Sequence, residues 1–391
     1  MRQAQYTITP RDVHHHAAQL CQHHLRLKDH GPKCTALNLL TVLFYAAARL
    51  ISRAAACASL RDAPCDSALY AALMATLPGI DELQRRLRRA LQGDLPKALR
   101  RRRQPLAIDL TLLPYHGEPL ADPSEVYRSQ AKSGTSHFHA YATAYVIRKG
   151  RRFTVALVYV RRGDDLADIV RELLRQAAKA GVRPRYVLLD RGFYSVSVVR
   201  YLQAARCPFL MPVPCKGRKA DHPKGPSGTR IFHLRQRSGW GQYTLRNAAG
   251  KPATLQICVR CRNYRGQWKR HGRQALVYGY WGLQPSSWLW VAQTYRLRFG
   301  IETTYRQLHQ ARIRTCTRDP LLRLLYVGIA LVLRNVWVWL HWEVLSHPRR
   351  GGRKIDLNQL GFRRMLVGLQ HLAEALFGVC DEFQSKRPIP A

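Results

Sequence analysis

Residues 106–113 read Leu-Ala-Ile-Asp-Leu-Thr-Leu-Leu, a short apolar run with one acid at its centre. The alternation of a β-strand puts Asp109 on one face together with Thr111, and the large aliphatic residues on the other. An ionised carboxylate inside a strand is costly unless it is paired with or bound to a cation. Asp109 is therefore either an ion-pair partner of a nearby arginine or a functional carboxylate, and the strand alone leaves both alternatives open.

The segments after this strand predict an α/β domain in the order strand, strand, strand, helix, strand, helix. The expected strands are Leu106–Leu113, Ala140–Arg148, Phe153–Val160 and Tyr186–Asp190, and the expected helices are Asp165–Ala180 and Ser195–Ala205. In such a sheet the fourth strand normally lies beside the first, through a right-handed crossover.

Asp190 ends the fourth of these strands and is followed by the turn Arg191-Gly192-Phe193. Residues at the carboxyl ends of strands in an open α/β sheet face the functional crevice. An aspartate that merely caps the turn is the alternative. The two acids are 190 − 109 = 81 positions apart, yet the adjacency of their strands predicts that the carboxylates lie close together.

The rest of the chain predicts a helical region, a β-rich insertion and further helices. Three short helices are expected at Ala36–Leu50, at Ser52–Leu60 and from Asp66 onward, where Ser52 and Asp66 are candidate caps. This layout suits a helix that enters a DNA major groove, and it suits an ordinary helical bundle equally well. The insertion has expected strands at Arg230–Leu234, Gln242–Arg246, Ala253–Arg262 and Gln274–Trp281, and the later helices are expected at Ser287–His309, Leu321–Leu345 and Leu357–Gly378.

The chain is strongly basic, with 64 Lys and Arg against 24 Asp and Glu in 391 residues, a net charge of +40. A polyanion is the first partner to expect. The densest run, Arg85–Arg103, carries nine positive charges and the single acid Asp94. It predicts either phosphate contacts, with Arg101, Arg102 and Arg103 as candidates, or a solvated linker.

Several other classes of protein are disfavoured. The chain lacks the G-x-x-x-x-G-K-[ST] loop of ATP-driven motors. Its ten cysteines are scattered and no apolar segment opens the chain, so we expect a reducing cytoplasm. The apolar run Leu324–Leu333 is shorter than the roughly 20 residues of a membrane span, so none is expected. Cys258 and Cys261 have metal-ligand spacing, but in a predicted strand they point to opposite faces, which disfavours zinc.

A third acid, Glu302, falls on the expected helix Ser287–His309. Helical spacing of three and four lines up one polar stripe, which consists of Tyr295, Arg298, Glu302, Tyr305 and His309. A surface pair between Arg298 and Glu302 is the alternative, although an arginine that precedes a glutamate by four positions is the weaker orientation. A stripe with two tyrosines, an arginine and a glutamate favours a site for phosphate and metal.

Three segments carry a family resemblance: Ile108-Asp109-Leu110-Thr111, then Leu188-Leu189-Asp190-Arg191-Gly192-Phe193-Tyr194, then Tyr295-x-x-Arg298-x-x-x-Glu302. Together they resemble the acidic motifs of DDE transposases of the IS4-like group, and the ISH3-like branch most of all, over roughly Leu106 to Leu345. The pattern of that group has a lysine where this chain has His309, and a neutral histidine is a weaker phosphate contact.

The resemblance implies an RNase H-like catalytic core with a β-rich insertion, an α/β fold that follows an N-terminal all-α DNA-binding region. It implies that Asp109, Asp190 and Glu302 are catalytic and hold Mg²⁺, for which Mn²⁺ is a possible substitute. The DNA contacts that it suggests, together with the basic run, are Tyr295, Arg298, Tyr305, His309, Arg191, Arg101, Arg102 and Arg103.

The expected domains are 1–104, a helical DNA-binding region with a basic linker; 105–206 and 287–346, the two parts of the core; 207–286, the insertion; and 347–391, a helical tail. The predicted function is that of a DNA transposase, which binds the terminal inverted repeats of an insertion sequence and performs cleavage and strand transfer. The expected partners are the repeats and target DNA, within a homodimer assembled on DNA, in a prokaryotic cytoplasm at the nucleoid. Two alternatives stay open: an inactive transposase-derived DNA-binding protein, and a metal-dependent nuclease without strand transfer.

Overall fold

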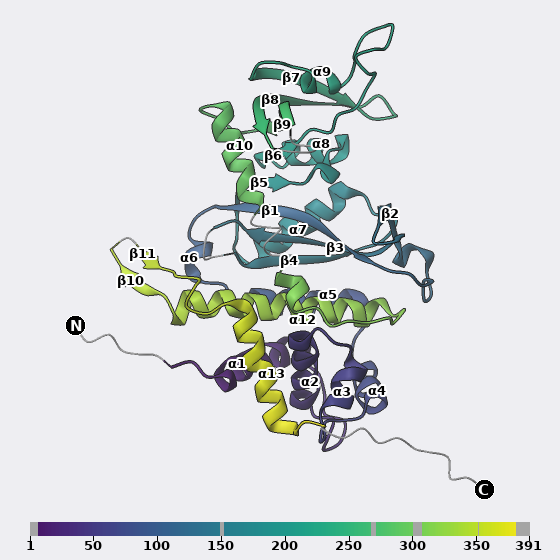
Figure 1. Ribbon diagram of the computed structural model, residues 1–391, viewed down its shortest axis with the longest axis vertical. Coiled ribbons are helices and arrows are strands. Elements are labelled where there is room, and N and C mark those ends of the chain that lie inside the picture. Colours follow the sequence, from purple (N-terminus) through teal and green to yellow (C-terminus); the bar gives the residue numbers. More distant parts are fainter. Residues whose placement is uncertain (1–6, 149–151, 267–270, 300–306, 351, 381–391) are drawn as a thin grey trace. The chain divides into compact units, whose positions relative to one another are not determined.

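The computed structural model describes residues 7–148, 152–266, 271–299, 307–350 and 352–380, which form two compact units (Figure 1). The helical unit comprises Met1–Leu95, Gly117–Ala121 and Tyr305–Ala391. The sheet unit comprises Pro96–His116 and Asp122–Thr304. The N-terminal helices and the C-terminal part of the chain thus belong to one unit, and the segment with the first two acidic motifs forms the other.

A single mixed sheet runs through the sheet unit. Its strands follow the order β2-β3-β1-β5-β6-β9-β8-β7, and β4 also pairs with β3. The bounds are β1 Gln104–Pro114, β2 Tyr127–Lys132, β3 Thr135–Val146, β4 Thr154–Val160, β5 Pro184–Leu189, β6 Phe209–Pro212, β7 Gly239–Arg246, β8 Pro252–Arg265 and β9 His271–Trp281. Because β1 pairs parallel with β5, the fourth predicted strand does lie beside the first. The predicted α/β class is confirmed.

Helices cover this sheet and connect its strands. They are α6 Lys97–Arg100, α7 Leu166–Lys179, α8 Val196–Ala204, α9 Arg230–His233 and α10 Trp288–Arg296. Asp165 caps α7 by accepting the N–H groups of Ala167 and Asp168, and α7 buries its apolar face on β3 and β4. The side chain of Gln176 on α7 accepts the N–H of Leu157 on β4 at 3.1 Å, which fixes helix and strand together.

The insertion extends the core sheet. β9 pairs antiparallel with β6, and β8 and β7 continue outward from it (Figure 1). Three of the four predicted insertion strands are confirmed, but the strand expected at Arg230–Leu234 is wrong, because Arg230–His233 forms the helical turn α9. Phe232 is buried there, and the hydroxyl of Thr229 accepts the N–H of Lys216 at 2.9 Å. A segment of five residues is too short for its pattern of polar and apolar residues to distinguish a strand from one helical turn.

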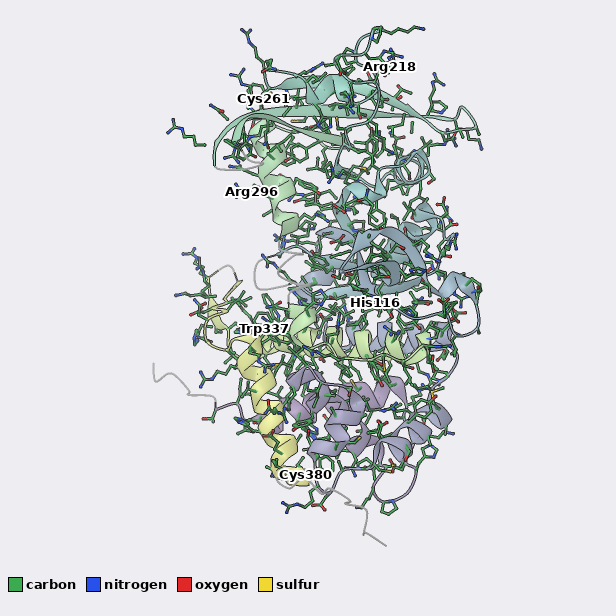
Figure 2. The ribbon with its side chains drawn as sticks, turned by 45° about the vertical axis from the view of Figure 1, so that its right-hand side comes forward. His116, Arg218, Cys261, Arg296, Trp337 and Cys380 are labelled. Carbon is green, nitrogen blue, oxygen red and sulfur yellow. The ribbon has the colours of Figure 1, made fainter. Side chains whose placement is uncertain are left out.

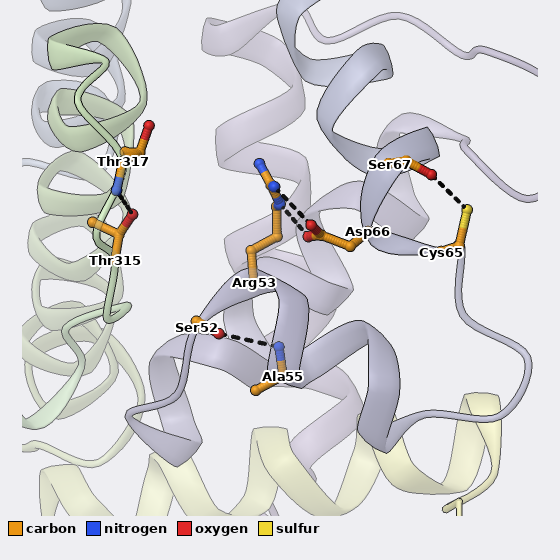
Figure 3. A network of polar contacts seen from close by, with 8 residues as sticks. All are labelled: Ser52, Arg53, Ala55, Cys65, Asp66, Ser67, Thr315 and Thr317. Atoms are coloured by element: carbon orange, nitrogen blue, oxygen red, sulfur yellow. Dashed lines mark hydrogen bonds and ion pairs between the residues drawn. The ribbon is translucent and has the colours of Figure 1, made fainter. Parts of the chain in front are cut away.

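The helical unit holds the three predicted short helices. Its elements are α1 Pro10–Leu25, α2 Ala36–Arg49, α3 Arg53–Ser59, α4 Asp66–Thr76, α5 Ile80–Gly93, α12 Pro320–Trp339, the π-helical turn Leu340–Val344, the hairpin β10 His347–Arg349 and β11 Gly352–Lys354, and α13 Phe362–Phe377. Ser52 caps α3 as predicted, accepting the N–H of Ala55 at 3.1 Å (Figure 3). The capping role expected for Asp66 is wrong, since its carboxylate instead pairs with Arg53 at 2.6 Å and 3.0 Å (Figure 3).

The first part of the basic run is a structured amphipathic helix. Leu83, Leu87 and Leu91 of α5 are buried, whereas Arg85 and Arg89 are exposed. Asp94, the single acid of the run, accepts from His16 at 2.9 Å. The interpretation as a solvated linker is therefore wrong for Arg85–Gly93, which is part of α5.

The chain ends of the helical unit pack on one another. α13 packs on α2, and α12 packs on α5. The side chain of Asn335 on α12 donates to the carbonyl of Leu91 at 3.0 Å, and the N–H of Asp62 donates to the carbonyl of Phe377 at 2.9 Å. Residues more than 200 positions apart therefore share one core.

The segment Pro320–Val344, formed by α12 and its π-helical turn, is longer than its apolar centre at Leu324–Leu333 suggests. It has 25 residues, and an 18-residue window within it reaches a mean hydropathy of 1.7. It is the one segment among the described residues long and apolar enough to cross a membrane. In the structure 94% of that window is buried inside the protein. Arg334 and Asn335 are buried within this segment. Buried polar side chains of this kind are typical of a core helix whose polar groups bond to neighbouring parts of the protein.

Candidate active site

The first two acids lie next to each other at the centre of the sheet unit. Ile108 of β1 is in register with Leu189 of β5, so the next residues along these parallel strands are Asp109 and Asp190. Asp109 is 9% exposed, and one of its oxygens accepts the N–H of Leu110 at 2.9 Å. Asp190 occupies the N-cap position of the turn Arg191–Phe193 but makes no capping hydrogen bond, so its carboxylate is available to other partners.

One guanidinium nitrogen contacts both carboxylates. Nη2 of Arg298 lies 3.3 Å from Oδ1 of Asp109 and 3.0 Å from Oδ1 of Asp190. Arg298 itself is 8% exposed, and its Nε is buried with no hydrogen-bond partner among the described residues. The structure therefore has one cation between two carboxylates, with one further donor of that cation available.

The electrostatics of this cluster are dominated by burial. Burial raises the pKa of Asp109 to about 6, helped by the Asp190 carboxylate and opposed by Arg298. Burial also opposes the charge of Arg298, but the Asp109 and Asp190 carboxylates and Tyr295 outweigh it and raise the pKa of the guanidinium. Asp109 is thus a carboxylate whose negative charge is incompletely compensated.

Tyr295 positions the end of α10 against the sheet. Its ring is buried and its hydroxyl donates to the carbonyl of Leu189 at 3.4 Å, one residue before Asp190. The guanidinium carbon of Arg298 lies 5.8 Å from the centre of the Tyr295 ring. Burial raises the pKa of Tyr295, so the hydroxyl remains a proton donor at neutral pH. Tyr295 therefore links the helix that carries Arg298 to the strand that presents Asp190.

The predicted continuous helix Ser287–His309 is wrong. α10 ends at Arg296, and Leu297–Phe299 forms a 3₁₀ turn. Glycine follows at position 300 of the sequence, and glycine has a low helix propensity. Leu297, at the start of this turn, is 49% exposed. Arg298 reaches the two aspartates from this turn and not from a regular helical face.

Of the remaining members of the predicted stripe, the structure describes only His309. Glu302 and Tyr305 lie outside the described residues. His309 is exposed, in a helical segment of the helical unit. The structure therefore places Tyr295 and Arg298 with the two aspartates, and the positions of Glu302 and Tyr305 stay predictions.

A cavity of about 610 Å³ opens beside Asp190 and Arg298. Sequence reasoning missed most of its walls, which come from the insertion strands and α10. The lining arginines are Arg191, Arg260, Arg262, Arg296 and Arg298, and the lining tyrosines are Tyr264, Tyr278 and Tyr295. Figure 2 shows one of them, Arg296, at the end of α10. No local pattern singles out β8 and β9 as cavity walls, because that role depends on the pairing of β9 with β6.

The predicted DNA-contacting arginines divide between two places in the sheet unit. Arg191 is exposed and lines the cavity beside Asp190. Arg101, Arg102 and Arg103 are exposed, lie just before β1, and line a separate cavity. Both places are basic, but only the first borders the acidic pair.

The donor chemistry of the acidic pair fits a divalent cation. Carboxylate oxygens are the ligands that Mg²⁺ and Mn²⁺ prefer in proteins. No group of three or more His, Cys, Asp or Glu gathers as a metal cluster within the described part of the chain, and Glu302 lies outside it. The pair thus supplies part of a site, with the excess negative charge that a cation would neutralise.

Comparison with known proteins gives the family. A model of the transposase DDE domain matches residues 100–335, more than half of the chain, and the chain therefore belongs to this family of transposases. Members of the family generally use divalent metal ions. No curated protein matches the chain.

Among solved structures, the fold is similar to that of a piggyBac transposase, determined in a synaptic complex with hairpin DNA. The TM-score is 0.52 at 12% sequence identity, and the alignment covers 94% of this chain and 78% of that one. At this identity the likeness concerns the fold.

Proposed function

We propose that the protein is the DNA transposase of a prokaryotic insertion sequence of the IS4-like group, acting at the nucleoid in the cytoplasm. It binds the terminal inverted repeats and performs Mg²⁺-dependent cleavage and strand transfer, with Mn²⁺ as a substitute. The observation that carries this proposal is the pair Asp109 and Asp190 on adjacent strands, joined by one arginine, in a chain of the transposase DDE domain family.

In this proposal the acids of an RNase H-like core serve as metal ligands. Asp109, Asp190 and Glu302 would hold the metal ions. When bound, the ions supply an activated water and stabilise the leaving oxygen of the phosphodiester. Among these three acids Asp109 suits the central place in the site. It is the more buried of the two described aspartates, and its strand β1 is hydrogen-bonded to a neighbouring strand on each side.

Arg298 and Tyr295 hold the scissile strand. If Asp109 and Asp190 held metal ions, the guanidinium of Arg298 would be free to bind a phosphate, and its Nε, which has no hydrogen-bond partner among the described residues, would add a second donor. Arg191 borders the same cavity and adds positive charge where the strand enters. Tyr305 and His309 are proposed contacts to the same DNA.

The DNA is held by further parts of the chain. We assign residues 1–104 to recognition of the inverted repeats, 105–206 and 287–346 to the catalytic core, 207–286 to the insertion, and 347–391 to the tail. The piggyBac relative was solved in a synaptic complex with hairpin DNA. By analogy, two copies of this chain would join the two repeats in a homodimer.

The test is a cleavage and joining assay on a plasmid that carries the genomic flanks of the gene, with a second plasmid as target. The proposal predicts nicks at the inverted repeats and covalently joined donor and target products, both dependent on Mg²⁺ or Mn²⁺. Asp109→Asn abolishes both. Asp168→Asn is the matched control, since it removes the same charge from an exposed aspartate of the same unit.

Each alternative function gives a different result in this assay. Specific binding without cleavage by the wild-type protein indicates an inactive DNA-binding protein. Metal-dependent cleavage without joined products indicates a nuclease. If no genomic copy of the gene is flanked by inverted repeats and short direct duplications, the protein has a domesticated role.

A further inference from the structure

A second basic site lies at the opposite end of the central strands from the acidic pair. The N–H of Gln104, the first residue of β1, donates to the carbonyl of Arg183 at 2.8 Å. The arginine run that precedes β1 and the arginine that precedes β5 are thereby brought together. Five arginines surround one cavity of about 420 Å³, with only Ala178 and Gly181 completing its lining: Arg100, Arg101, Arg102, Arg103 and Arg183.

The backbone of this cavity is held in place by buried groups. The side chain of Gln104 is fully buried, and its Nε2 donates to the carbonyls of Leu99 at 3.1 Å and Arg102 at 2.8 Å. The stem of Arg100 packs on Gly181, where an added Cβ would lie 3.3 Å from the Cγ of Arg100. Gly181 also has a φ of +78°, which favours glycine. The arrangement is therefore specified by the fold and is not a loose run of surface arginines.

The charge of this cavity is uncompensated. No acidic residue lines it, and within the described parts of the chain none of its five arginines forms an ion pair. Burial also raises the pKa of Cys207 near this edge to about 11, with Arg103 opposing the rise. Like charges held together repel one another, and a bound anion relieves that repulsion.

The cavity is separate from the acidic pair. Asp109 lies five positions after Gln104 along the extended strand, about 17 Å at roughly 3.3 Å for each position. A phosphate in this cavity and a phosphate at Asp109 are therefore far apart, and one phosphate cannot contact both.

We propose that the cavity formed by Arg100–Arg103 and Arg183 binds the phosphate backbone of duplex DNA away from the reacting bond. Arginine suits this ligand because its planar guanidinium binds phosphate oxygens in pairs. The choice of DNA over other polyanions rests on the proposed transposase function. The proposal adds Arg183 and Arg100 to the predicted contacts, and it assigns Arg101–Arg103 to a duplex segment distinct from the scissile phosphate.

The test is the salt dependence of binding of the full chain to a 30-base-pair duplex of arbitrary sequence, in EDTA. The variant is Arg102→Gln with Arg183→Gln. The slope of log K against log salt is negative, and each lost phosphate contact reduces its magnitude by about 0.9. Loss of both arginines therefore reduces the magnitude by about 1.8. The control is Arg171→Gln with Arg175→Gln, which removes the same charge from arginines of the same unit that already pair with Asp168 and Glu172. We expect this control to change the slope by less than about 0.5.

Three further measurements make the result decisive. Circular dichroism establishes that the variant is folded, and Arg102→Lys with Arg183→Lys, which keeps the charge, is expected to restore most of the slope. An unchanged slope in the glutamine variant, or an equal change in the control, overturns the proposal. Tighter binding of an RNA duplex of the same length through the same arginines overturns the choice of DNA. Because the assay needs no cleavage, its result is independent of whether Asp109→Asn abolishes nicking.

Discussion

Asp109→Asn should stabilise the folded protein at neutral pH while it abolishes activity. Burial raises the pKa of Asp109 from 3.8 to about 6, so the folded state favours the protonated form. At about 1.36 kcal/mol for each pKa unit, ionised Asp109 costs the fold on the order of 3 kcal/mol. Well below pH 3.8 the carboxyl is protonated in both the folded and the unfolded chain, and the cost disappears.

The sign of the effect therefore depends on pH. The contribution of Asp109 to stability is present at low pH and is lost as the pH rises through about 6. Asparagine carries no charge at any pH, so the variant should exceed the wild type by about 1 kcal/mol at pH 4.5 and by about 3 kcal/mol at pH 7.5.

The measurement is the free energy of unfolding in urea across this pH range, in EDTA so that no divalent ion contributes. Asp168→Asn is the control, because that carboxylate is exposed and paired with Arg171, and its effect should stay within about 0.5 kcal/mol at every pH. A gain for Asp109→Asn that is the same at both ends of the range, or a loss at pH 7.5, would refute the argument that burial of this carboxylate destabilises the fold.

Two further predictions concern the helical unit. A methyl group at Gly328 of α12 would lie 2.3 Å from Cδ2 and 2.9 Å from Cγ of Leu87, so Gly328→Ala should destabilise the protein by about 1–3 kcal/mol despite the better helix propensity of alanine. Urea unfolding should show a smaller loss in a Leu87→Ala background, and a gain in the wild-type background contradicts the close packing. A hydrogen bond from Ser67 lowers the pKa of exposed Cys65, whereas burial raises the pKa of Cys57 to about 12. Iodoacetamide at pH 8 should therefore alkylate Cys65 faster than Cys57. Peptide mass spectrometry measures both rates, which should be nearer to each other in Ser67→Ala; equal rates in the wild type contradict the prediction.

The central part of the site could be predicted because it follows from local pattern and chain topology. Asp109 stands out as an acid inside an apolar alternating strand, and Asp190 as the acid at a strand end. The rule for right-handed crossovers then places their strands side by side, as the structure has them. No tertiary detail is needed for any of these steps.

The bridging position of Arg298 could not be predicted in this way. Helical periodicity assumes that the helix continues, but regular helix ends at Arg296 and the next three residues form a 3₁₀ turn. The direction of one side chain depends on that turn, and a period averaged over 20 residues does not resolve it. The cavity walls on β8 and β9 depend on strand pairing across the insertion, for which the sequence carries no local signal.

Two further elements carry recognisable signals in the sequence. Thr9 and Asp12 form a capping box with a proline at the first turn of α1, a recognisable start of a helix. Ser133 and Gly134 both have positive φ, which makes the tight turn between β2 and β3. Helix and hairpin could therefore have been placed from residue types alone.

The discontinuous helical unit has a consequence for biosynthesis. α2 and α5 leave the ribosome more than 200 residues before α12 and α13, which complete their core. Until then the faces of α2 and α5 that pack on α13 and α12 have no permanent partner, and the nascent chain depends on chaperones or on transient contacts. A premature stop codon after the sheet unit would yield a protein that lacks α12 and α13 and therefore cannot complete this core. Such truncated proteins should be degraded, and they should not compete with the full-length protein for DNA.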